Sequence, residues 1–85
     1  SLATADLVVE ILSPSTAHYD RTTKADTYAA LGVCELWLVD VERRTIEQRV
    51  LVDGGWCVEG VHSGATVVHA ASFPELAVAL ADVFA

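Results

Sequence analysis

An acidic side chain stands inside an otherwise apolar stretch near the start of the sequence. Residues 6 to 12 read Asp-Leu-Val-Val-Glu-Ile-Leu, a pattern typical of a strand in a packed sheet, and Glu10 is the carboxylate within it. Burying an ionised carboxylate costs several kcal/mol unless a cation, a metal ion or several hydrogen-bond donors compensate it. Either this strand is half exposed, or Glu10 has a partner.

The segment that follows offers such a partner. Asp20, Lys24 and Tyr28 recur at four-residue spacing, so a helix over this segment places them on one face. The ordinary interpretation is a surface ion pair between Asp20 and Lys24, worth a few tenths of a kcal/mol, with Tyr28 packed beside it. However, Lys24 is the only lysine in the chain. A helix directly after the Glu10 strand packs back over the sheet, where this ammonium could reach the carboxylate.

A carboxylate, a divalent cation and a lysine together suit phosphodiester hydrolysis. The metal lowers the pKa of a water molecule, and the lysine positions the nucleophile or stabilises the developing oxyanion. Glu10 is the better metal ligand, because it lies near the carboxyl end of its strand, where open α/β sheets place their sites. Asp6 shares its strand face but lies roughly 13 Å away, too far to bind the same ion. The structural alternatives are a Glu10–Lys24 salt bridge in a half-exposed sheet and a solvated Asp6.

The first half of the sequence predicts a strand, a helix and a second strand. The first strand runs from about residue 5 to Leu12 and ends at Ser13-Pro14, since proline cannot donate to a ladder. The helix runs from residue 15 or 16 to Leu31, with Gly32 as its left-handed stop. The second strand covers residues 33–40, with Leu36 and Leu38 on one face and Trp37 and Val39 on the other. These elements form a βαβ unit in a parallel or mixed sheet.

The second half predicts a hairpin and a terminal helix. Residues 45–52 alternate between the two faces of an antiparallel strand with one wet face, and Asp53-Gly54-Gly55 predicts a turn to a partner strand over 56–61. We expect another short strand over 66–69. The last helix opens at Phe73-Pro74-Glu75 and continues to the terminus. The fold class is therefore α/β, as a single domain over residues 1–85.

Composition limits the partners of this chain. At 85 residues with 53% apolar content, it is long enough for one small core. Twelve acidic residues against five basic ones give a formal charge of −7, so any contact with nucleic acid must be local. No apolar run approaches the roughly 20 residues that span a bilayer. We therefore expect a cytoplasmic protein without a membrane partner.

Long stretches of this sequence also resemble a known family. The stretch "DLVVEILSPST", the Asp, Lys and Tyr of the helix, and "GVCELWLVDVERRTIE" resemble the bacterial Uma-two family of restriction endonucleases, in the PD-(D/E)xK nuclease superfamily. The resemblance covers nearly the whole chain. It implies a restriction-endonuclease-like mixed sheet, present here as a partial core: β-α-β, an antiparallel hairpin and a terminal helix. It also implies cleavage of DNA phosphodiester bonds with Mg²⁺.

The resemblance assigns roles to individual residues. Glu10 matches the family's acidic metal ligand. Lys24 resembles the active-site lysine that this family carries on the following helix, which would explain why Leu12 stands where the usual lysine belongs. Asp6 matches the aspartate of the family's second Pro-Asp sequence, although Ala5 replaces the proline, and it is the second metal-ligand candidate.

The expected site is therefore a Mg²⁺-dependent nuclease centre. Glu10 would hold the metal, Lys24 would assist the nucleophile or the transition state, and Asp20 and Tyr28 would orient Lys24. The superfamily's first metal-binding aspartate comes from a hairpin upstream of this segment, so we expect the chain alone to form an incomplete site. The alternative is a non-catalytic interaction or homodimerisation module derived from a nuclease fold.

Overall fold

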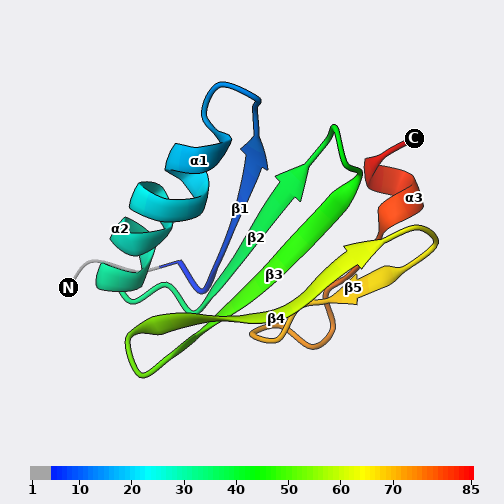
Figure 1. Cartoon of the computed structure of the whole chain (residues 1–85). Coiled ribbons are helices and arrows are strands. Elements are labelled where there is room, and N and C mark those ends of the chain that lie inside the picture. The colour runs from blue at the N-terminus through cyan, green and yellow to red at the C-terminus, as the bar shows by residue number, and fades with distance from the viewer. Residues whose placement is uncertain (1–4) are drawn as a thin grey trace.

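The computed structural model describes residues 5–85 as a mixed sheet with a helical layer on one face (Figure 1). The main sheet contains β1 (Leu7–Leu12), β2 (Glu35–Asp40), β3 (Thr45–Val52) and β4 (Gly55–Ser63), in that spatial order. β1 and β2 are parallel, whereas β2–β3 and β3–β4 are antiparallel. The predicted mixed α/β sheet is confirmed, and the hairpin turn lies where Asp53-Gly54 predicts it.

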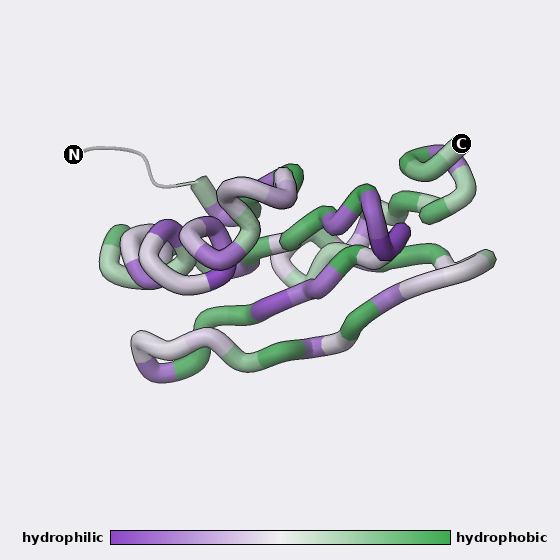
Figure 2. Tube along the Cα trace, turned by 45° about the horizontal axis from the view of Figure 1, so that its top comes forward, coloured by the Kyte–Doolittle hydropathy of each residue, from purple (hydrophilic) through white to green (hydrophobic). Residues whose placement is uncertain are grey.

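The crossover between β1 and β2 is one helical segment of three parts. It consists of α1 (Ala17–Tyr19), a single π-helical stretch η1 (Asp20–Lys24) and α2 (Ala25–Ala30). Gly32 follows with a φ of 81°, the left-handed stop that the sequence predicts. Figure 2 shows this segment as mostly hydrophilic or neutral with a few weakly hydrophobic positions, as expected for a helix that covers a sheet on one side only. Within residues 5–85, no helix has the length and apolar character needed to cross a membrane.

The main sheet has a separate apolar core on each face. The core under the helices contains Leu12, Ala25, Leu36 and Leu38, with Trp56 packed against it. The core on the opposite face contains Trp37, Val39, Ile46, Val68, Ala70 and Leu80. Alternate residues of β2 therefore face different cores, as its sequence predicts. A second layer, formed by the short strands β5 (Val67–His69) and β6 (Ala77–Ala79) and by α3 (Leu80–Val83), covers part of the opposite face.

The buried carboxylate of Glu35 joins this second layer to the main sheet. Its side chain is only 1% exposed, and it accepts hydrogen bonds from Trp37 Nε1 and Gln48 Nε2, each at 2.8 Å. It also accepts from the backbone N–H of Ala71 at 3.0 Å and from the N–H and Oγ of Ser72 at 2.8 and 2.6 Å. Burial alone raises the pKa of Glu35, but these hydrogen bonds outweigh it and lower the pKa from 4.5 to about 2.

The predicted terminal helix is wrong over its first half. Residues Ala77–Ala79 form β6, which pairs antiparallel with β5, and only Leu80–Val83 are helical. The preceding segment is fastened to Glu35 through Ala71 and Ser72. A turn then closes through the N–H of Leu76, which donates to the carbonyl of Phe73 at 2.8 Å. The turn reverses the chain so that β6 runs antiparallel to β5, and the backbone groups of β6 form hydrogen bonds with that strand.

The Glu35 carboxylate predicts how stability depends on pH. Because the pKa is depressed in the folded chain, its contribution is fully present above about pH 4.5 and is lost as the pH falls toward 2. A shift of this size corresponds to about 3 kcal/mol. Urea denaturation at a series of pH values should show this loss, and Glu35→Gln should be less stable at pH 7 with a flatter acid dependence. An unchanged acid dependence in Glu35→Gln would assign the loss to other carboxylates.

Candidate functional site

Glu10 lies on the face of β1 that the helices cover. It sits opposite Leu38 in the parallel ladder, and its side chain is 18% exposed. Its strand neighbours Val9 and Ile11 point to the other face, where they are 50% and 68% exposed. The carboxylate is thus held between an apolar sheet and the helical layer, with a limited opening to solvent.

The helical segment brings two side chains to this carboxylate. Lys24 Nζ lies 3.1 Å from Oε2 of Glu10, and the hydroxyl of Tyr28 donates a hydrogen bond to Oε1. Lys24 is 38% exposed, so the group is open on the lysine side. The contact between Glu10 and Lys24 is the one anticipated from the strand and helix faces. Tyr28 was expected to orient Lys24, and in the structure its hydroxyl bonds Glu10 instead.

These contacts fix the protonation states of the group. The hydrogen bond from Tyr28, followed by the bond and charge of Lys24, lowers the pKa of Glu10 against the opposing effect of burial. The same contact with Glu10 raises the pKa of Lys24 and that of Tyr28. At neutral pH the group therefore combines a carboxylate, an ammonium and a neutral phenol. The ammonium can donate hydrogen bonds and stabilise negative charge, but it cannot act as a base.

Asp20 lies behind Lys24 on the helical segment. Asp20 is only 5% exposed, and the hydroxyl of Thr16 donates a hydrogen bond to its Oδ2 at 3.0 Å. Its Oδ1 lies 3.8 Å from Lys24 Nζ. The Lys24 ammonium therefore lies near two carboxylates, in direct contact with Glu10 and at a longer distance from Asp20.

Asp6 stands apart from this group. It is exposed and precedes β1, and its carbonyl accepts a hydrogen bond from the N–H of Glu35 at 3.0 Å. Among residues 5–85, no hydrogen bond or ion pair joins its side chain to Glu10, Lys24 or Tyr28. Its assignment to a metal ion stays a prediction.

The residues of this site can supply part of a Mg²⁺ coordination sphere. No three His, Cys, Asp or Glu side chains of the described chain gather closely enough to hold an ion by themselves. Glu10 is ionised, and each of its oxygens keeps a second lone pair beyond its present hydrogen bond. Mg²⁺ commonly takes one or two carboxylates and completes its octahedron with waters and substrate phosphates. Glu10 fits that arrangement as a single protein ligand.

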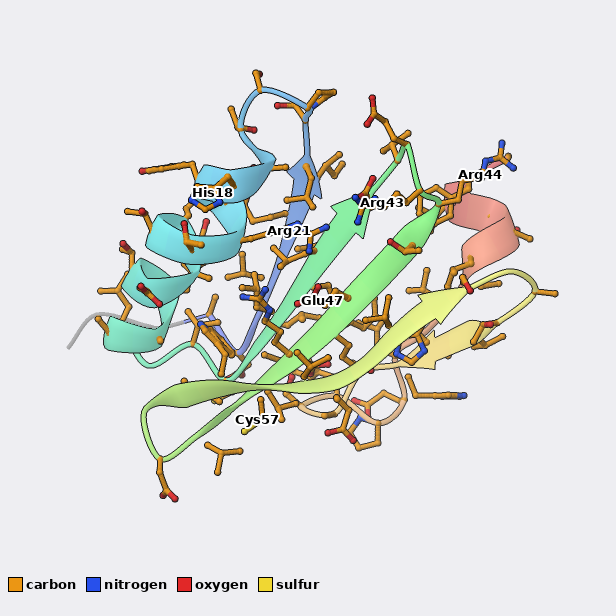
Figure 3. The ribbon with its side chains drawn as sticks, in the orientation of Figure 1. His18, Arg21, Arg43, Arg44, Glu47 and Cys57 are labelled. Carbon is orange, nitrogen blue, oxygen red and sulfur yellow. The ribbon has the colours of Figure 1, made fainter. Side chains whose placement is uncertain are left out.

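A network of charged side chains, which was not predicted from the sequence, links the helical segment to β2 and β3. Arg21 bonds Asp40 at 3.3 Å and Glu47 at 2.9 Å, and Arg49 bonds Glu47 at 2.5 Å. Figure 3 shows Arg21 reaching from the helical segment over the sheet toward Glu47. Glu47 and Arg49 are two residues apart on one strand, so their shared face was readable. Their pairing with Arg21 depends on how the helix crosses the sheet, which local patterns do not give.

The hydrogen bond from Tyr28 predicts the effect of removing one oxygen atom. Tyr28→Phe deletes the donor to Glu10, so the pKa of Glu10 should rise toward its ordinary value while the Lys24 contact persists. Carboxyl ¹³C chemical shifts of Glu10 followed through an NMR pH titration measure this rise. Tyr19→Phe is the matched control, because Tyr19 is 54% exposed. Equal titration curves for wild type and Tyr28→Phe would contradict the assigned role.

Comparison with known proteins agrees with this fold. Residues 2–81 match the model of the Uma2 family, which is described as "Putative restriction endonuclease". A crystal structure of a "putative nuclease belonging to DUF820" from Anabaena variabilis ATCC 29413 resembles this fold with a TM-score of 0.75 and 26% sequence identity. The likeness covers 98% of this chain and 45% of that one, so the chain spans less than half the length of that nuclease. No match to a curated protein was found. The resemblance noted in the sequence is therefore confirmed, and the chain belongs to the Uma2 family.

Proposed function

We propose that this chain carries the Glu10 and Lys24 part of a divalent-metal-dependent endonuclease site that hydrolyses DNA phosphodiester bonds. Membership of the Uma2 family supports a nuclease-like function. The observation that carries the proposal is the 3.1 Å contact between Lys24 Nζ and the Glu10 carboxylate, in a position open to solvent on the lysine side. An anion and a cation in contact at such a place can bind a metal ion and a phosphate together.

Each residue of the group has a distinct task in this proposal. Glu10 would hold Mg²⁺, and a bound Mg²⁺ would supply a water of lowered pKa and neutralise phosphate charge. Lys24 is protonated and donates to the phosphate oxygen on which negative charge develops. Tyr28 fixes the orientation of the Glu10 carboxylate through its hydroxyl. Asp20 helps to hold the Lys24 ammonium at the site through its nearby carboxylate.

The charge of the chain shapes how DNA would approach. With a formal charge of −7, the surface as a whole repels a polyanion. Contact must therefore begin where positive charge reaches solvent, at Lys24 and at the Arg43-Arg44 turn, where Arg43 is 79% exposed. Figure 3 shows Arg43 and Arg44 at the turn between β2 and β3, near the end of the sheet. Cytoplasmic location stays a prediction.

A Mg²⁺ titration followed by amide NMR tests the metal assignment. We expect saturable shifts near Glu10 and Lys24 at millimolar Mg²⁺, and we expect Glu10→Gln to abolish them while keeping the same fold. Asp6→Asn is the matched control, since it removes an exposed carboxylate just before the same strand. If Asp6→Asn abolishes the shifts and Glu10→Gln does not, the metal assignment is reversed.

A cleavage assay tests the reaction. Mg²⁺-dependent nicking of plasmid DNA by the chain, or by a longer protein that contains it, should fall by at least about 100-fold in Glu10→Ala and in Lys24→Ala. Both variants should retain the wild-type circular dichroism spectrum. Loss of the fold in parallel with activity would instead make Glu10–Lys24 a structural salt bridge.

A second candidate function is an interaction module that pairs through β1. Among residues 5–85, β1 lies at the edge of the main sheet, and its face away from the helices exposes Val9 and Ile11. An apolar strand at a free edge is a template for pairing with another chain. This candidate predicts a homodimer that sedimentation equilibrium detects at micromolar concentration and that Ile11→Lys dissociates. A monomer at all concentrations would exclude self-association through this edge.

A further inference from the structure

The turn that carries Lys24 has an unusual backbone. Residues Asp20–Lys24 are π-helical, between two α-helical parts. The N–H of Ala25, which would bond the carbonyl of Arg21 in an α-helix, donates instead to the carbonyl of Thr22. A π-helical turn is rare and widens the helix at one place, so a side chain from outside can reach a carbonyl there.

A side chain from β3 makes that contact. Arg49 Nη1 donates to the carbonyl oxygen of Arg21 at 3.0 Å. The same guanidinium bonds Glu47, and Glu47 in turn accepts from the guanidinium of Arg21. Arg49 and Glu47 are each 15% exposed. The helix is thus bound to the sheet at one residue through both its backbone and its side chain.

A second side chain holds the other end of the turn. Trp56 Nε1, from β4, donates to the carbonyl oxygen of Ala25 at 2.7 Å. The carbonyls of residues 21 and 25 therefore both bond side chains of the sheet, and Lys24 lies between them. Lys24 is 38% exposed and flexible, so its reach to Glu10 depends on where this turn is held.

We propose that Arg49 is a positioning residue for Lys24, which it places against Glu10 by binding the Arg21 carbonyl of the π-helical turn. The catalytic meaning of this placement rests on the proposed nuclease function, whereas the placement itself does not. Among the charged side chains of residues 5–85, Arg49 alone contacts both the backbone of the turn and Glu47, which also bonds Arg21. Its geometry is demanding, because a planar guanidinium must bond in two directions at once.

The single lysine of the chain makes the experiment specific. In a ¹⁵N-labelled chain, the side-chain ammonium region contains a signal from Lys24 only. We expect this signal to be restricted in wild type, and to become mobile in Arg49→Gln with a several-fold faster acylation of Lys24, read on its peptide by mass spectrometry. Arg49→Lys should give intermediate values, because it keeps the charge but not the planar fork. Arg43→Gln, which removes an exposed arginine near Asp40, should match wild type.

Three results would overturn the proposal. The first is a lower melting temperature in Arg49→Gln with an unchanged Lys24 signal, which would make Arg49 merely structural. The second is an equal effect of Arg43→Gln, which would assign the change to charge alone. If Arg49→Gln does not fold, the test passes to Arg49→Lys. The third contradictory result is a Lys24 signal in Arg49→Lys that is the same as in wild type. None of these readouts requires cleavage, so an absence of nuclease activity in every variant would reject the proposed function without touching this inference.

Discussion

The buried Glu35 carboxylate is the interaction on which the arrangement of the two layers depends. A carboxylate with 1% exposure is tolerable only because five hydrogen bonds reach it from two strands and from the segment between β5 and β6. The same bonds decide where that segment runs, and so where the second core closes against Trp37 and Val39. One face of β2 is thereby packed in the second core, and its other face lies beneath the helices and Glu10.

Local patterns predicted the elements whose causes are local. Gly32 ends the helical segment, Asp53-Gly54 turns the hairpin, and alternation along β2 separates the two cores, all from neighbouring residues. The prediction of the terminal helix was wrong because the structure of that segment depends on residues distant in sequence. Residues 76–80 alternate Leu, Ala, Val, Ala and Leu, a pattern that suits a strand as well as a helix, and the choice is made by β5 and Glu35.

The contacts of the candidate site also fall into those that the sequence could predict and those that it could not. The faces of one strand and one helix were enough to bring Glu10 and Lys24 together, because the crossover connection leaves the helix few places to pack. The individual hydrogen-bond partners at the site could not be predicted from the sequence. Tyr28 bonds the carboxylate itself, and Arg21 finds Glu47 across 26 residues of sequence. Both depend on the rotation of the helix over the sheet, which a π-helical turn changes without leaving a recognisable sequence signal.

The π-helical turn also bears on how this site tolerates insertion and deletion. A residue advances an α-helix by about 100°, so removing one residue between Thr16 and Lys24 would turn the ammonium away from Glu10 while leaving the composition of the helix almost unchanged. Glu10 and Lys24, which are 14 positions apart in the sequence, can therefore meet in space only because the helix is wound in this way.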